Sequence, residues 1–379
     1  MPAAVTNRPA TSAKGAATKG SVVVQRGHLT QALARIMPIA ASRHLLPVLT
    51  GVRLTLVDGL LKLTVSDLDV TATCAVPIGT ASKDFDAVVP ARRLQRLLQA
   101  AAGDIQLDIR PGSPPSVEVT WGRTTATFEC FDPKEWPDDV EVKGDRIHLS
   151  ADDLDLLRRA AVFCSRDDAR PILTGLGFGP DGVSGSDSYR LFNTTLAAKL
   201  PKRTFILPAR VLRFLPPKVL GEQEALLTVG EREATLACGD IHVIGRLIDG
   251  DFPTLEKILN MVKSPTKLTF QRSELAAAVR AAKAVFEQAE PVKFDLADAE
   301  KTGAAKLVLT SDQNRIESEV SVAVSGTPIP SIAFNPAYLA EVLQVSSASE
   351  VTLGICDALK PMIIEEDTWR LLLMPVRSK

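Results

Sequence analysis

The chain has 379 residues and a formal net charge of −1, with 45% apolar and 23% charged residues. This length exceeds one typical core and fits two or three domains of an ordinary globular protein. No apolar run is long enough for a membrane span or a signal-peptide core. The five cysteines lie far apart without a Cys-x-x-Cys pair, which argues against a zinc site or disulfide framework and for a reducing, cytoplasmic location.

Residues 1–20 contain no acidic residue and almost nothing to bury. This composition predicts a disordered, weakly basic tail rather than a transit peptide, because a single Arg and no amphipathic pattern are present.

The first structured stretch begins with HLTQALARIM at His28, whose apolar residues recur at steps of three and four, as an amphipathic helix requires. An apolar strand, LKLTVSDLD, then runs into Ser66 and Asp67. VPARRLQRLL at 89–98 predicts a strand-like entry, a proline corner and a basic helix. Alternating segments from Ile105 to Phe131, split by turn residues, predict closing strands.

The same landmarks return twice in the same order. The second copy has the helix DLDLLRRAAV, the strand GVSGSDSYR, the corner LPARVLRFLP and closing strands over 225–248. The third copy has ELAAAVRAAK, LVLTSDQNR, FNPAYLAEVL and closing strands over 351–376.

The spacing of these landmarks is nearly constant. Leu29, Leu154 and Leu275 are separated by 125 and 121 residues, and the Ser-Asp and Pro landmarks recur at similar intervals. The sequence therefore predicts an α+β protein of three tandem repeats, each of a comfortable domain size. We place a tail at 1–20 and repeats at 21–144, 145–264 and 265–379.

Basic residues concentrate on the repeated helices. The first repeat carries Arg35, Arg92, Arg93 and Arg96, and the second carries Arg158, Arg159, Arg210 and Arg213. The third offers only Arg280 and Lys283, with Glu341 opposing them. One such charge usually marks a solvated helix face, but Arg on equivalent helices of successive repeats predicts a shared basic surface. Such a surface neutralises phosphates without reading bases.

Tandem repeats also leave sheet edges at each end of the chain, and pairing with a second chain is one remedy. If each repeat turns the chain through a similar angle, a symmetric dimer closes the arc into a ring. Ring closure is a hypothesis at this point.

The patterns of catalytic sites are absent from the sequence. It has no phosphate loop, no His-Glu-x-x-His helix and no Gly-x-Ser-x-Gly elbow, and its four histidines have no metal-ligand spacing. The acidic pairs Asp138-Asp139 and Asp167-Asp168 fit loops or caps better than a catalytic dyad. We expect no catalytic residue, no metal and no cofactor, and therefore no enzyme.

In combination, these motifs resemble the bacterial β sliding clamp family over residues 21 to the C-terminus. LLPVLTGVRL and LTVSDLDV resemble its first domain, RPILTG, SDSYRL and IDGDFPTLEKIL its second, and FNPAYLAEVL and MPVR its third. The resemblance implies a head-to-tail homodimer of six domains, with helices inward and sheets outward. Double-stranded DNA passes through this ring without sequence specificity.

The resemblance also implies protein partners, namely the replicative polymerase, other polymerases, the clamp loader and repair factors, and no membrane. They insert short motifs into a pocket between the second and third domains. The pocket residues carried over are Leu173, Ser186, Ser188, Tyr189, Arg190, Leu191, Pro253, Lys257, Ile258, Asn335, Tyr338, Leu359, Pro361, Leu372, Leu373, Met374, Pro375, Val376 and Arg377. Leu, Ile, Val and Pro walls can accept apolar anchors of an extended peptide, and Met374 can re-pack for different partners.

For DNA contact the resemblance points to Arg43 in a loop. Arg92, Arg93, Arg96, Arg158, Arg210 and Arg213 follow from the repeated helices. The chain departs from the family at Ser188-Tyr189, where a Gly-His or similar pair is common, so we expect an aromatic ring that packs and narrows the groove.

Two alternatives stay open. One is a specialised second clamp copy, either phage-borne or resistant to clamp-directed antibiotics. The other is a tandem-repeat peptide-binding scaffold that does not encircle DNA.

Overall fold

The computed structural model describes residues 19–40, 45–81, 83–180, 182–213, 224–253, 256–285, 290–310 and 314–377. Apart from its last two residues, the predicted disordered tail lies outside this range. Contacts group the chain into two compact units, which are described separately: unit 1 is 1–154 with 210–247, and unit 2 is 155–209 with 248–379. No described helix is long and apolar enough to cross a membrane.

Unit 1 contains two antiparallel sheets within the described residues. The smaller has the order β1 (Gly20–Gln25), β6 (Asp104–Arg110), β7 (Ser116–Trp121), β8 (Thr124–Glu129). The larger has the order β5 (Phe85–Pro90), β2 (Gly51–Val57), β3 (Leu60–Ser66), β4 (Val70–Val76), β16 (Ile241–Arg246), β15 (Glu233–Cys238), β14 (Ala225–Val229), β9 (Asp145–Leu149). The pairing of β4 with β16 joins strands of the first and second repeats, with Cys74 opposite Ile241.

The helices of unit 1 cover these sheets with their apolar faces. Helix α1 (Arg26–Ile36) packs on β4 and on α2 (Ala91–Ala100). In α2 the apolar residues Leu94 and Leu98 are buried while Arg92, Arg93 and Arg96 are exposed, which confirms the predicted amphipathic pattern. Two 3-10 turns, Pro47–Thr50 and Pro133–Glu135, flank a small core of Val48, Leu49, Val88 and Trp136.

Unit 2 is built on a single antiparallel sheet of twelve described strands. Its order is β13 (Phe205–Pro208), β10 (Gly175–Gly179), β11 (Gly182–Ser186), β12 (Arg190–Thr194), β24 (Trp369–Leu373), β23 (Met362–Glu366), β22 (Glu350–Ile355), β17 (Thr266–Gln271), β20 (Arg315–Gly326), β19 (Ala304–Thr310), β18 (Val292–Asp295), β21 (Ser331–Phe334). The second and third repeats join where β12 pairs with β24, which places Leu191 opposite Leu372.

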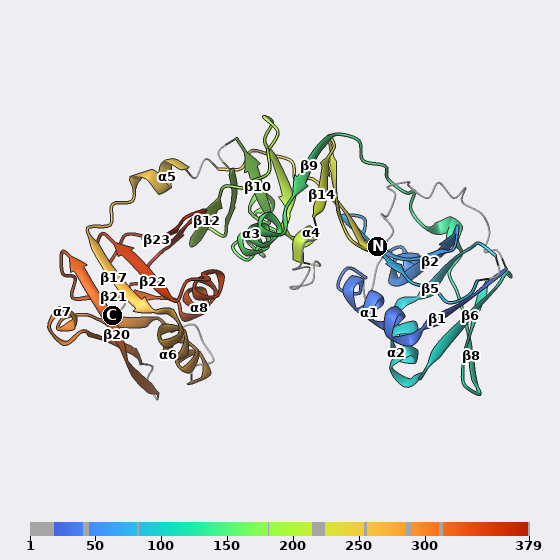
Figure 1. The fold of residues 1–379 in the computed structure, drawn as a ribbon, viewed down its shortest axis with the longest axis horizontal. Coiled ribbons are helices and arrows are strands. Elements are labelled where there is room, and N and C mark those ends of the chain that lie inside the picture. Colours follow the sequence, from blue (N-terminus) through green and yellow to red (C-terminus); the bar gives the residue numbers. More distant parts are fainter. Residues whose placement is uncertain are drawn as a thin grey trace. The chain divides into compact units, whose positions relative to one another are not determined.

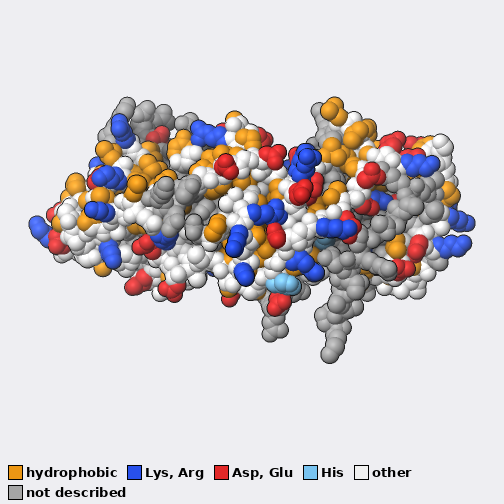
Figure 2. All heavy atoms as spheres, turned by 90° about the horizontal axis from the view of Figure 1, so that it is seen from above, with side chains coloured by type: hydrophobic (Ala, Val, Ile, Leu, Met, Phe, Trp, Pro, Cys, Tyr) orange, Lys and Arg blue, Asp and Glu red, His pale blue; other side chains and the backbone are white. Residues whose placement is uncertain are grey.

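Helices α6 (Arg272–Val285) and α8 (Pro336–Val345) pack together in unit 2, and Figure 1 shows them side by side. The remaining helices are α3 (Ala151–Ala161), α4 (Ala209–Arg213), α5 (Glu256–Met261), α7 (Ala299–Thr302) and the 3-10 turn Pro171–Leu173. The face drawn in Figure 2 intermixes Lys and Arg with Asp and Glu, as a net charge of −1 allows.

The proline corners behave as the sequence predicts in two of three copies. Pro90 precedes α2, and Pro336 is the first residue of α8, whose amide donors are capped by the Asn335 side chain. After Pro208 only the short α4 is described, and residues 214–223 lie outside the described range.

The Ser-Asp landmarks are turns of one design. The Asp67 Oδ1 accepts the amides of Asp69 (3.2 Å) and Val70 (2.9 Å), while Leu68 adopts φ 77°. In the second repeat the Asp187 Oδ1 accepts the amides of Tyr189 and Arg190, both at 3.0 Å. Asp side chains favour such local bonds, which explains why the pair recurs. The third copy, Ser311-Asp312, lies outside the described residues.

Candidate peptide-binding site

The Ser-Asp turn of the second repeat fixes the backbone at one border of the site. The Ser186 hydroxyl donates to the Arg190 carbonyl (2.9 Å) and accepts from the Ser188 amide (3.2 Å). Ser188 has φ 79°, and its hydroxyl accepts a hydrogen bond from Arg170 at 2.9 Å. The Tyr189 carbonyl accepts from the Met374 amide at 2.9 Å, so the segment after β24 runs along this turn.

Arg190 is the buried charge of the site, with only 6% of its side chain exposed. Its Nε donates to the Asp187 Oδ2 at 2.9 Å, its Nη2 donates to the Val162 carbonyl at 3.2 Å, and its Nη1 pairs with the Glu341 carboxylate. Two carboxylates and a carbonyl compensate the burial of this guanidinium. Because these groups hold Arg190, it is a structural anchor of the pocket wall.

Two aromatic rings lie close to the Arg190 guanidinium. Its central carbon lies 5.0 Å from the Phe163 ring centre and 4.5 Å from that of Tyr338. Burial raises the pKa of the Tyr338 hydroxyl, and the nearby Asp187 carboxylate adds to this while Arg190 opposes it. Tyr338 in turn stacks on Tyr189, with ring centres 6.1 Å apart.

Apolar side chains form the floor beside this stack. Leu191, Leu259, Ile363 and Leu372 make a buried cluster, and the partly buried Phe252 and Val262 pack against it. Five apolar residues that lie close to this cluster in the sequence are exposed: Tyr189, Ile258, Leu359, Met374 and Val376. A buried apolar cluster with exposed apolar residues nearby in the sequence is the composition expected of a site for extended peptides.

The predicted basic residues divide into paired and unpaired groups. Arg158 lies 3.8 Å from Asp155 on α3, and Arg210 pairs with the Asp67 carboxylate of the first Ser-Asp turn. By contrast, Arg92, Arg93 and Arg96 are exposed on α2, and within the described part of the chain none has a carboxylate partner at ion-pair distance. These three line a hollow of about 430 Å³ together with Thr50, Glu129 and Phe131.

Three family models match successive stretches of the chain: the N-terminal, central and C-terminal domains of the DNA polymerase III beta subunit, over 21–137, 150–254 and 262–377. The chain belongs to this family. It is 26% identical to the beta sliding clamp of Chlamydia pneumoniae over 369 residues, covering 94% of this chain and 98% of the relative. The clamp of Pseudomonas aeruginosa is likewise 26% identical over 372 residues, covering 93% and 99%.

Solved clamp structures have the same fold. The Pseudomonas aeruginosa clamp bound to griselimycin matches with a TM-score of 0.82 at 23% identity, covering 95% of this chain and 100% of that one. The Bartonella birtlesii clamp bound to griselimycin matches with a TM-score of 0.82 at 21% identity, with the same coverage. These matches confirm the predicted fold class of three tandem clamp domains. The exact domain boundaries stay a prediction.

The structure brings most of the predicted pocket residues of this clamp-family chain to one region. Ser186 ends β11, Ser188 and Tyr189 lie in the turn, and Arg190 and Leu191 begin β12. The Tyr189 carbonyl accepts the Met374 amide of the segment after β24. The Asn335 side chain caps α8, and Leu373 is fully buried. The side chain of Lys257 lies outside the described residues, as do Arg43 and the side chain of Arg213.

The other predicted pocket residues lie around this centre. Leu173 is buried at the end of its 3-10 turn, Pro253 is exposed before α5, and Leu359 and Pro361 flank the start of β23. Pro375 and Arg377 continue the terminal segment, where the Val376 amide donates to the Ala333 carbonyl at 2.8 Å.

Sequence reasoning missed several residues of the site. Phe163, Leu259 and Ile363 were unremarkable apolar positions, and Glu341 was interpreted as opposing a basic surface on the third repeat. The structure instead pairs Glu341 with Arg190. Asp187 was noticed only as a repeat landmark, and its equivalence to Asp67 was the one available signal that it orders a turn.

The described cysteines and acidic residues were considered as candidate nucleophiles and metal ligands. All five cysteines are free thiols, and burial raises the pKa of Cys74 and Cys130 to about 12. Thiols with raised pKa values are poor nucleophiles. Among the described residues no group of three or more His, Cys, Asp or Glu side chains could hold a metal ion.

Proposed function

We propose that this chain is a DNA sliding clamp: a non-enzymatic, cofactor-free ring that encircles duplex DNA in the cytoplasm and holds the replicative polymerase on it. The observation that carries this proposal is the order of three clamp-family domains along almost the whole chain. Family membership favours the clamp over a tandem-repeat scaffold that does not encircle DNA.

DNA contact in this proposal is electrostatic. Arg92, Arg93 and Arg96 are exposed on one helix, and exposed Arg side chains neutralise phosphates without reading base edges. Arg158 and Arg210 are already near carboxylates and contribute less net charge. Arg43 and Arg213 remain proposed DNA contacts. We therefore expect DNA binding to depend on the salt concentration and on whether the DNA is circular, and not on the base sequence.

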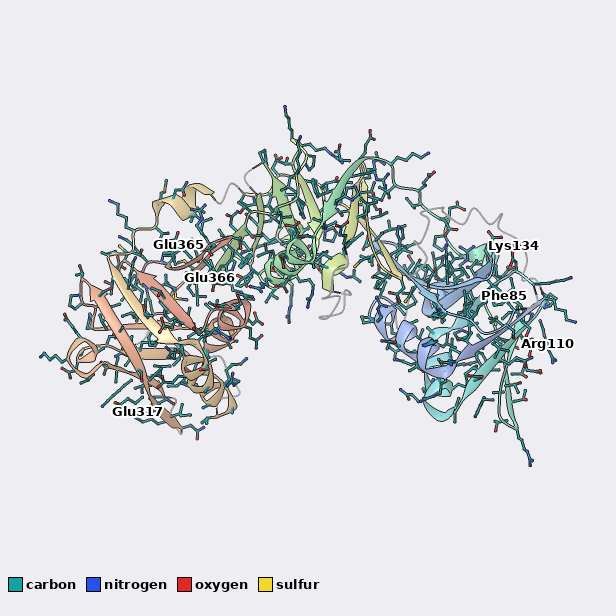
Figure 3. All side chains as sticks on the ribbon, in the orientation of Figure 1. Phe85, Arg110, Lys134, Glu317, Glu365 and Glu366 are labelled. Atoms are coloured by element: carbon teal, nitrogen blue, oxygen red, sulfur yellow. The ribbon has the colours of Figure 1, made fainter. Side chains whose placement is uncertain are left out.

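Ring closure requires a partner, and each unit offers a free strand edge for one. In the described sheets β8 pairs only with β7, and residues 315–321 of β20 pair only with β19. Glu317, labelled in Figure 3 near the tip of the β19–β20 hairpin, is exposed on β20, as is Glu319. A head-to-tail homodimer joins these edges.

The groove in unit 2 is the proposed docking site for polymerases, the clamp loader and repair factors, each through a short extended peptide. Its apolar floor accepts aliphatic anchors, and the exposed Met374 re-packs for different sequences. Griselimycin, to which the Pseudomonas aeruginosa and Bartonella birtlesii clamps are bound in their solved structures, is expected to compete with such a peptide here.

Loading onto nicked circular DNA tests the proposal. A clamp loader places the protein on the circle, and gel filtration separates DNA-bound from free protein. We expect retention on the circle and release after a restriction enzyme linearises it. Equal retention on linear and circular DNA would instead support a scaffold that binds DNA or peptides without encircling it.

A further inference from the structure

Strands of neighbouring repeats pair at two junctions that are built alike. The first junction is the pairing of β4 with β16 in unit 1, and the second is the pairing of β12 with β24 in unit 2. At the first junction the Asp240 carbonyl accepts the Ala75 amide at 2.8 Å, and at the second the Thr368 carbonyl accepts the Thr195 amide at 3.1 Å. Asp240 and Thr368 are therefore equivalent residues, each in the turn that precedes the strand of its junction.

An ion pair reinforces the first junction at this position. Arg35, at the end of α1, donates from its Nη1 to both carboxylate oxygens of Asp240, at 2.8 and 2.6 Å. The same nitrogen lies 3.8 Å from the Cys74 Sγ on β4. One guanidinium thus links a helix and a strand of the first repeat to a turn of the second. The sequence placed Arg35 on a shared basic surface, whereas in the structure Asp240 compensates its charge.

At the second junction a neutral hydrogen bond takes this place. Cys74 lies opposite Ile241 and Thr194 lies opposite Trp369, the first residues of β16 and β24, so Thr194 is the equivalent of Cys74. The Thr194 hydroxyl donates to the Thr368 carbonyl at 2.9 Å, and Thr194 is only 1% exposed. No charge is needed for this contact.

The ionic contacts of the two junctions also differ in their exposure to solvent. At the first junction the Asp240 side chain is 50% exposed, and that of Arg210, which pairs with Asp67, is 43% exposed. At the second junction the side chain of Arg190 is only 6% exposed. Salt screens exposed charge pairs much more than buried ones. The first junction should therefore weaken as the ionic strength rises, while the second should not.

The closed ion pair leaves one polar atom of Arg35 unsatisfied. Its Nε is buried and has no hydrogen-bond partner among the residues that the structure describes. A buried donor without a partner costs free energy, which hydration recovers once the side chain is released. The attraction of Asp240 and the hydration of Nε therefore act in opposite directions, and the ion pair is only weakly held closed.

We propose that the Arg35–Asp240 ion pair is a releasable contact, so that the first junction opens locally before the second junction does. Local opening means that β4 and β16 lose their mutual hydrogen bonds while the rest of the chain stays folded. This inference goes beyond the proposed function and does not rest on it. Only its consequence does: in a ring-forming chain, bending costs least at the first junction.

Hydrogen exchange of the full-length protein, followed by mass spectrometry, tests the inference. Peptides that contain 70–76 and 241–246 report on the first junction, and peptides that contain 190–194 and 369–373 report on the second in the same sample. We expect exchange at the first junction to become about two- to fivefold faster when NaCl is raised from about 0.05 M to about 1 M. Exchange at the second junction should stay constant.

Two matched variants assign the effect to this ion pair. Asp240→Asn removes the charge but keeps the size of the side chain, so in about 0.05 M NaCl its first junction should exchange about two- to fivefold faster than that of the parent and should lose most of the response to salt. Glu118→Gln is the control, because Glu118 pairs with Arg110 at 2.6 Å between β6 and β7 of the same unit, in the sheet that contains neither junction. It should exchange as the parent does at both junctions.

An equal response of both junctions to salt in the parent, or parent-like exchange at the first junction in Asp240→Asn, would overturn the inference. Circular dichroism checks that the variants fold, and if Asp240→Asn does not fold, the comparison of the two junctions in the parent decides. Retention on circular DNA is measured separately, so failure of the proposed function would leave this result unchanged.

Discussion

The Ser-Asp turn of the first repeat and that of the second share a backbone but differ in what surrounds them. In both, a serine hydroxyl and an aspartate oxygen hold a left-handed residue, Leu68 or Ser188. The second oxygen of Asp67 pairs with Arg210, which is 43% exposed. That of Asp187 pairs with Arg190, which is buried between two rings. Both repeats therefore have the same turn, and the residues around it differ. The first copy links strands of two repeats, whereas the second borders the candidate peptide-binding site.

The largest difference in stability between the two copies is expected when the arginine that pairs with each turn's Asp is replaced by Ala. Arg190→Ala leaves two carboxylates without their shared partner and opens a gap between Phe163 and Tyr338, so we expect a loss of about 3 kcal/mol in the free energy of unfolding. Arg210→Ala removes a half-exposed pair and should cost less than about 1 kcal/mol. Urea unfolding of both variants gives the comparison, and equal losses would contradict it.

Removing the serine hydroxyl should have a smaller effect of similar size in the two copies. Ser66 and Ser186 are both buried, and each hydroxyl accepts the amide of the left-handed residue at 3.2 Å. Each also has a second partner, Thr71 for Ser66 and the Arg190 carbonyl for Ser186. Ser66→Ala and Ser186→Ala should each cost about 1–2 kcal/mol. Thermal unfolding measures both, and a large cost for only one would show that the turns are not equivalent.

The weakest expected difference is in the pH dependence of stability, because all the histidines of the sequence belong to unit 1 and the half-buried His242 lies where strands of the first and second repeats pair. His242 lies on β16 opposite Thr73 of β4, and burial, with a contribution from Lys62, lowers its pKa below the ordinary 6.5. The unfolded chain then binds the proton more readily, so the stability of unit 1 should fall as the pH drops below 6.5. His242→Gln should flatten this part of the profile, measured by urea unfolding at a series of pH values. A profile that is identical in parent and variant would contradict this assignment.

The sequence predicted the repeats because helix periodicity and proline corners are local signals. It also indicated that Asp67 and Asp187 are equivalent. Their turns, however, need a positive φ at Leu68 and at Ser188, and the sequence does not predict a positive φ for residues other than glycine. The division of the middle repeat between two sheets was not predictable, because the partners Cys74 and Ile241 are far apart in the chain. The ion pair of Glu341 with Arg190 was not predictable for the same reason, since the two residues belong to different repeats.

In the proposed function, the three clamp-family domains of one chain make half of a six-domain ring, so the central claim is that two copies associate. Sedimentation velocity at micromolar concentration tests it most directly. The account predicts a single species of about twice 40.7 kDa. A parent protein that sediments as a stable 40.7 kDa monomer at this concentration would contradict it.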